Sequence, residues 1–111
     1  MIDAAKLTSL TVMIRDEIAA LESLSAVSRD SRAPVALDQQ SVGRLSRMDA
    51  MQQQSMELAT ESRRRQRLSM LVAAQRRLHD GDYGYCLACD AEIAVKRLEI
   101  DPAATRCIAC A

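Results

Sequence analysis

The chain has 111 residues, with 15 basic and 15 acidic side chains and a formal net charge of zero. Its only aromatic residues are two tyrosines, which argues against a sheet that stacks single-stranded bases on aromatic rings. The balanced charge also offers no bulk attraction to nucleic acid. Ala, Leu, Met, Val and Ile are spread instead through long stretches without Gly or Pro, a composition typical of extended helices.

The first predicted element is a helix over about residues 3–24. Asp3 is suited to be its N-cap, because a carboxylate can accept hydrogen bonds from the free N–H groups of the first turn. Residues 25–41 carry Ser, Asp and Pro without a sustained period, which predicts a connection. The apolar positions of the helix recur three or four residues apart and so share one face: Leu7, Leu10, Ile14, Ile18, Leu21 and Leu24.

A second, longer helix is predicted over residues 42–79, with Gly81 in a stop signal that follows it. At 1.5 Å per residue this helix would be about 57 Å long. A helix of that length needs a partner, and the first helix is the one candidate in the chain. We therefore expect residues 1–80 to form an antiparallel coiled-coil hairpin with the connection at its tip.

The seam of this hairpin is predicted from the apolar residues of the second helix. Methionines 48, 51 and 56 are interpreted as seam packing. Residues 61–67, with the sequence ESRRRQR, interrupt the stripe and predict a softer stretch or a shift of the seam. The expected seam residues are Val42, Leu45, Met48, Met56 and Ala59 at one end, and Leu68, Leu71, Val72, Gln75 and Leu78 at the other.

Four arginines lie close together in this interruption: Arg63, Arg64, Arg65 and Arg67. One interpretation is a solvated face, in which Glu61 pairs with Arg64 or Arg65 at three and four residues' separation. The other is a set of contacts to an acidic partner surface.

The strongest chemical signal is a pair of Cys-x-x-Cys motifs separated by 17 residues. Two tight turns of this kind aim four sulfurs at one ion, so Cys86, Cys89, Cys107 and Cys110 are predicted to hold a single zinc. Such a site leaves no position for water or substrate and is structural. Two alternatives to a metal site are less suitable: disulfides would need an oxidising compartment, and a thioredoxin-like redox pair would need a strand-rich domain. Iron is the alternative metal, because thiolates also bind iron.

Residues 81–111 are therefore expected to form a small C4 zinc-ribbon-like finger that depends on its metal to fold. Lys96, Arg97 and Arg106 lie close enough in sequence to offset the negative charge of four thiolates and one zinc ion. Ile93, Val95, Leu98 and Ile100 alternate, which favours a short strand or an extended turn.

The string GDYGYCLAC, followed by Glu-Ile, Arg-Leu, a Pro and the second cysteine pair, resembles the zinc finger of the bacterial DksA/TraR family, the DnaK suppressor proteins. A long coiled-coil helix directly before the finger is also that family's arrangement. The resemblance implies a mainly α fold and a transcription regulator that binds RNA polymerase through its secondary channel, without binding DNA directly. It further implies acidic residues at the hairpin tip, near the catalytic magnesium.

By position, Asp38 and Asp49 are the candidates for these tip acids, with a helix N-cap as the alternative role for Asp38 and a surface acid for Asp49. The tip motif of DksA itself, Asp-x-x-Asp-x-Ala, is absent in that form, and Arg44 and Arg47 add positive charge. DksA also has an arginine before the finger's proline that helps to bind ppGpp, whereas this chain has Asp101 there. An acid repels a pyrophosphate, so ppGpp binding at that position is expected to be weak or absent.

The sequence thus predicts a cytoplasmic, monomeric protein with one structural zinc. It is not expected to be an enzyme, because its metal site is closed and no catalytic set is visible. No membrane association is expected, because no uncharged run approaches the 18 to 20 residues of a membrane span. Two other functions stay open: a nucleic-acid-binding zinc ribbon with the arginine cluster as a phosphate track, and a coiled-coil interaction module without polymerase binding.

Overall fold

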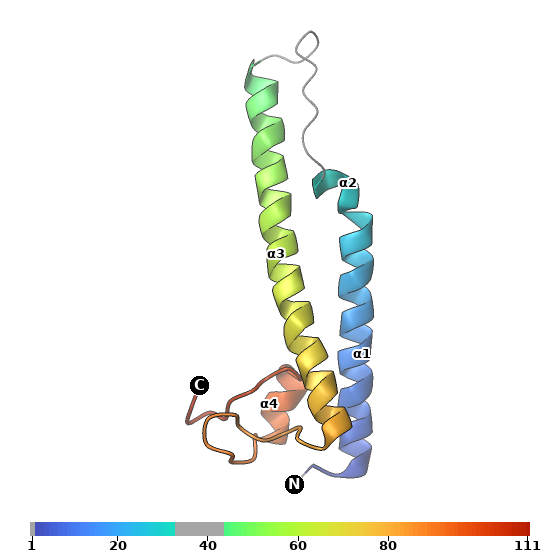
Figure 1. Cartoon of the computed structure of the whole chain (residues 1–111), viewed down its shortest axis with the longest axis vertical. Helices are drawn as coiled ribbons and strands as arrows, with labels where there is room; N and C mark the ends of the chain where they lie inside the picture. Colours follow the sequence, from blue (N-terminus) through green and yellow to red (C-terminus); the bar gives the residue numbers. More distant parts are fainter. Residues whose placement is uncertain (1, 33–43) are drawn as a thin grey trace.

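The computed structural model describes residues 2–32 and 44–111, which form a rod with a small finger folded against its base (Figure 1). The helices are α1 (Ala4–Val27), α2 (Arg29–Arg32), α3 (Arg44–Asp80) and α4 (Val95–Ile100). α1 and α3 run antiparallel side by side, and the finger, which contains α4, packs where α1 begins and α3 ends. The molecule extends over 65 × 26 × 20 Å.

Helix α1 begins as the sequence predicts. The Asp3 carboxylate accepts a hydrogen bond of 2.7 Å from the backbone N–H of Lys6, which confirms Asp3 as the N-cap. The helix runs on to Val27 and is followed by α2, so the first residues of the predicted connection are helical. The Arg32 guanidinium supports this extension, because it donates a hydrogen bond of 2.5 Å back to the Ser25 carbonyl, one of the carbonyls that a helix end leaves unpaired.

Helix α3 has 37 residues and is therefore about 56 Å long. It ends at the predicted stop signal. Gly81 has a φ of +82°, a left-handed conformation that glycine adopts without strain. This turn lets the N–H of Asp82 donate a hydrogen bond of 2.9 Å to the Arg77 carbonyl, which closes the last turn of the helix.

The core is concentrated at the base of the rod. Between the two long helices, Leu10, Ile14, Leu71 and Ala74 are fully buried. This group continues without a break into the buried residues of the finger, so the hairpin and the finger share one hydrophobic core. The finger's members of that core are Tyr83, Cys86, Ile93, Leu98 and Ala103.

Three methionines predicted to pack inside the hairpin lie instead on its surface. Met48, Met51 and Met56 are 53% to 58% exposed, so their interpretation as seam packing is wrong. At this level of α3 the half-buried positions are Ala50, Gln54, Glu57 and Thr60, which puts the methionines elsewhere on the helix. Val72, another predicted seam residue, is also exposed.

The short strand or extended turn expected over residues 93–100 is also wrong for most of its length. Residues Val95–Ile100 form helix α4, in which Leu98 is buried while Ile100 is exposed. Extended pairing in this part of the finger is limited to an isolated antiparallel bridge between Tyr85 and Glu92. Within the part of the chain that the structure describes, every helix is too short or too polar to cross a lipid bilayer.

Candidate metal centre

Each cysteine pair sits on a tight turn held by backbone hydrogen bonds. In the first turn, the N–H of Asp90 donates to the Cys86 carbonyl at 2.9 Å, with Asp90 itself left-handed at a φ of +62°. In the second, the N–H of Cys110 donates to the Cys107 carbonyl at 3.1 Å. The two turns are joined by a 2.8 Å hydrogen bond from Leu87 N–H to the Thr105 carbonyl, so neither pair is positioned independently of the other.

The four sulfurs converge on one point. All four Sγ atoms lie within 4.8 Å of one another, and those of Cys89 and Cys107 are 3.6 Å apart. Zinc–sulfur bonds of 2.3 Å in a tetrahedron give sulfur–sulfur separations of about 3.8 Å. All four cysteines are free thiols, and a disulfide would hold its sulfurs at about 2.05 Å. The donor set therefore fits one tetrahedral zinc ion, which is structural because four thiolates fill its coordination sphere.

Backbone N–H groups lower the pKa of at least one of these thiols, Cys86. N–H groups of Cys107, and then of Cys89 and Ala88, lower the pKa of Cys86 to about 6, against the opposing effect of its burial. Zinc binds the thiolate rather than the thiol, so a lowered pKa makes binding less dependent on displacing a proton.

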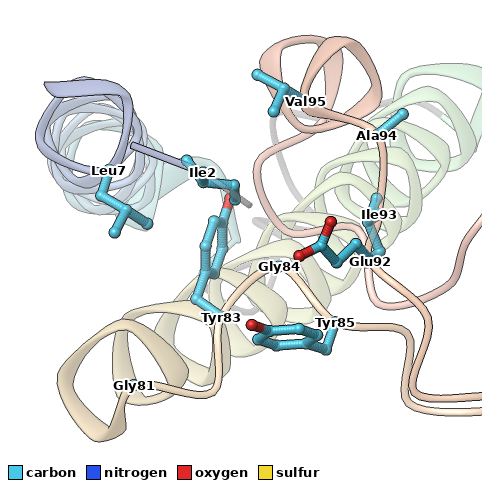
Figure 2. Close-up of a pocket in the computed structure, with 10 residues that line it drawn as sticks. All are labelled: Ile2, Leu7, Gly81, Tyr83, Gly84, Tyr85, Glu92, Ile93, Ala94 and Val95. Atoms are coloured by element: carbon cyan, nitrogen blue, oxygen red, sulfur yellow. The ribbon is translucent and has the colours of Figure 1, made fainter. Parts of the chain in front are cut away.

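A buried tyrosine ties the two halves of the finger together. The Tyr83 hydroxyl donates a hydrogen bond of 2.7 Å to the carbonyl of Pro102, between α4 and the second cysteine pair. Burial raises the pKa of Tyr83 to about 12. Its ring also forms part of a hollow of about 340 Å³ between the finger and the start of α1, toward which Ile2 and Leu7 reach (Figure 2).

The same hollow shows why residue 84 is a glycine. Gly84 has a φ of +94°, and a β-carbon there would lie 2.8 Å from Cδ1 of Ile2. Any other side chain would push this residue away and strain the backbone. Ile2 lies beside Gly84 and packs against the shared core, so residues before α1 contact the finger (Figure 2).

Arg67 connects three parts of the molecule. From α3, its guanidinium donates to both oxygens of Glu17 on α1, at 3.2 and 2.9 Å, and to Asp101 beside α4 at 2.8 Å. The Asp101 carboxylate also accepts a hydrogen bond from the Ala103 N–H. We call this group the Arg67 clamp; it fixes the finger against both helices of the hairpin.

A second polar cluster, centred on Glu61, lies farther along the rod. The Glu61 side chain is 5% exposed, and its oxygens lie 2.8 Å from Arg64, 3.1 Å from Arg32 and 3.4 Å from Arg65. A hydrogen bond from the Ser25 hydroxyl, followed by those from the arginines, lowers the pKa of Glu61 to about 2. The predicted pairing of Glu61 with Arg64 or Arg65 is confirmed for both arginines. The interpretation as a solvated face is wrong for Glu61 and Arg64, because Ser25 and Arg32 cover them from the neighbouring segment.

Of the remaining predicted site residues, the structure describes Asp49, Arg63 and Arg65. Asp49 is exposed on α3, near the end of the helix farther from the finger, whereas Asp38 lies outside the described residues. Arg63 is exposed and donates a hydrogen bond of 3.2 Å to the Thr60 hydroxyl. All four clustered arginines have partners within the chain, but Arg64 and Arg67 are half-buried whereas Arg63 and Arg65 are exposed.

Comparison with known proteins agrees with the resemblance of the sequence to the DksA/TraR family. Residues 81–111 match the family model described as the prokaryotic dksA/traR C4-type zinc finger. The RNA polymerase-binding transcription factor DksA of Escherichia coli (strain K12) is 38% identical over 56 residues, which cover 50% of this chain and 37% of that protein. The protein of the same name from Haemophilus influenzae is 39% identical over 56 residues, 50% of this chain and 39% of its own length.

Similarity of the fold extends over more of the chain than similarity of the sequence. The structure of transcription factor DksA2 from Pseudomonas aeruginosa superposes with a TM-score of 0.73, covering 97% of this chain and 81% of that one at 24% identity. The matched sequence spans well under half the length of the curated relatives. The four converging cysteines and the family match together identify one structural zinc, and residues 81–111 are similar to the C4-type zinc finger of the DksA/TraR family.

Proposed function

We propose that this protein is a bacterial transcription regulator that binds RNA polymerase, inserting the end of its hairpin farther from the finger into the enzyme's secondary channel. The observation that carries the proposal is the attachment of a dksA/traR finger to a narrow two-helix rod. Curated proteins with related fingers are named RNA polymerase-binding transcription factors. A rod 65 Å long and at most 26 Å across has dimensions that suit entry into a channel.

The proposed active element is a carboxylate carried near the end of the rod. Asp49 is exposed on the part of α3 farthest from the finger, and Asp38 precedes that helix in sequence. A carboxylate close to a catalytic magnesium ion alters the local potential. In this proposal the protein catalyses nothing itself, and its zinc holds the base of the rod.

The arrangement of the clustered arginines favours this function over nucleic-acid binding along a track of phosphate contacts. A track needs side chains free to meet successive phosphates, yet Arg64, Arg65 and Arg67 are paired with acids of the chain. Arg63 and Arg65, whose side chains are exposed, are the candidate contacts to the partner. We also expect ppGpp to bind weakly or not at all beside Pro102, because Asp101 stands where DksA has an arginine that helps to bind ppGpp, and the adjacent Arg67 is already engaged by Asp101.

Site-specific crosslinking to core polymerase tests the proposal. A photo-crosslinking amino acid at Asp38 or at Asp49 should capture polymerase segments that line the secondary channel. The same amino acid at Ala73, an exposed position in the other half of α3, serves as the matched control and should give no channel crosslinks. Crosslinks from Asp49 that map outside the channel, or an absence of polymerase binding, would contradict the proposal.

A further inference from the structure

Arg77 lies in the last turn of α3, where the hairpin meets the finger, and it lines a hollow beside the first cysteine pair. The Arg77 carbonyl accepts the hydrogen bond that closes this turn, so the residue is fixed in position relative to the finger. The hollow has a volume of about 440 Å³ and is lined by Arg77, Asp82, Tyr85, Cys86, Leu87 and Asp90. A cation of the hairpin and a zinc ligand of the finger thus share one hollow.

One end of the Arg77 guanidinium is buried without a partner. Among residues 2–32 and 44–111, its Nη2 atom has no hydrogen-bond acceptor. Asp82 and Asp90 line the same hollow, yet within these ranges neither forms an ion pair with Arg77. Buried polar groups nearly always have a partner, and a buried donor of a cation is especially costly to leave unpaired. The arrangement therefore points to an anionic group of the zinc-loaded finger.

The zinc-loaded centre supplies such a group. Four thiolates and one zinc ion together carry a charge of about −2. Of the bases expected to offset it, Lys96 and Arg106 are exposed, where water and salt screen their charges, and Arg97 already donates its Nε–H to the Arg106 carbonyl. The charge of Arg77, by contrast, acts inside the finger: burial raises the pKa of Tyr83 to about 12, and Arg77 opposes this rise.

We infer that Arg77 is the counter-ion of the zinc–thiolate centre, and that its positive charge helps the four cysteines to retain the metal. Arg77 is not a ligand, because a guanidinium keeps its protons and offers no lone pair to zinc. A residue of the hairpin then contributes to metal affinity through its charge, in addition to the shared core. This inference concerns the metal centre alone, and it holds whether or not the protein binds polymerase.

The zinc affinity of the full chain, measured by competition with a chromophoric chelator at fixed pH, tests this inference. Arg77→Met removes the charge but keeps an apolar stem, and it should weaken zinc binding about 10- to 100-fold, the loss typical of residues that support the ligands of a metal. Arg77→Lys keeps the charge and should lose less. Arg76→Met is the matched control, because Arg76 is an exposed neighbour that forms no ion pair within the described ranges; its zinc affinity should equal that of the wild type.

Cobalt(II) bound in the same site gives a second readout, which a loss of packing alone would not change. A cation near the thiolates lowers the energy of their donor orbitals, so the sulfur-to-cobalt charge-transfer band should move to longer wavelength in Arg77→Met and stay in place in Arg77→Lys and Arg76→Met. The inference is wrong if Arg77→Met binds zinc as tightly as its control, if Arg77→Lys loses as much affinity as Arg77→Met, or if the band does not move. If Arg77→Met does not fold with zinc, Arg77→Gln, which keeps N–H donors without the charge, replaces it in the same comparisons.

Discussion

The Arg67 clamp gives a quantitative prediction for Arg67→Met. Methionine keeps an apolar stem but leaves Glu17 and Asp101 without their shared cation. Pairs between partly exposed groups contribute up to about 1 kcal/mol each, and the 2.8 Å and 2.9 Å contacts of Arg67 place both pairs at the upper end of that range. Arg67→Met should therefore lower the free energy of unfolding by about 2 kcal/mol.

Urea unfolding of the zinc-loaded protein, followed by circular dichroism, measures this loss. Arg76→Met is the matched control, because Arg76 is exposed on the same helix and forms no ion pair within residues 2–32 and 44–111; it should lose less than about 0.5 kcal/mol. A double-mutant cycle with Asp101→Asn isolates the contact to the finger. Additive losses in that cycle, or a loss from Arg67→Met no larger than that of its control, would refute the clamp.

Three further predictions concern the acid cluster, the tyrosine and the metal. Because the folded pKa of Glu61 is lowered from 4.5 to about 2, its contribution to stability is present above pH 4.5 and lost as the pH falls toward 2. Glu61→Gln should flatten this part of the acid-unfolding curve and lower stability at neutral pH. Tyr83→Phe leaves the Pro102 carbonyl without its donor and should lower the unfolding free energy by about 1–2 kcal/mol in thermal or urea melts. Since the folded pKa of Tyr83 is raised from 10 to about 12, the wild type should also lose stability as the pH rises from 10 to 12, a loss that the phenylalanine variant should lack. Cys107→Ser should release zinc, measured by metal analysis, and unfold the finger while much of the hairpin's helical dichroism survives; unchanged metal content would argue against four-thiolate binding.

Local signals in the sequence were sufficient for the start of α1, the end of α3 and the metal centre. An acid at a helix start and a glycine after a helix end act within one turn, and the structure has Asp3 and Gly81 in these roles. The Cys-x-x-Cys spacing likewise sets the geometry of each turn. The structure then brings the two turns together.

Features that depend on distant partners were missed. In the sequence, Glu61 resembles a surface acid that pairs with two arginines of its own helix. Its third cation, Arg32, comes from a segment without periodicity, so the sequence did not predict this contact. Arg67 and Asp101 are 34 residues apart and only the packing of the finger on the hairpin brings them together. Helix α4 was mistaken for a strand because six residues are too few to distinguish a period of 3.6 from one of 2.

The shared core explains how a small metal-bound finger can fix the orientation of a long helical rod. Helix α3 is about 56 Å long, so a tilt of about 10° at its base would move its far end by about 10 Å. The zinc-bound finger meets the rod at its base through buried Leu98 and Tyr83, the close approach of Ile2 to Gly84, and the Arg67 clamp. Under the proposed function, these contacts hold the rod in one orientation relative to the finger when the far end enters the channel. Arg67→Met should then broaden or shift the crosslinks made from Asp49 even where binding is retained, whereas Arg76→Met should leave them in place.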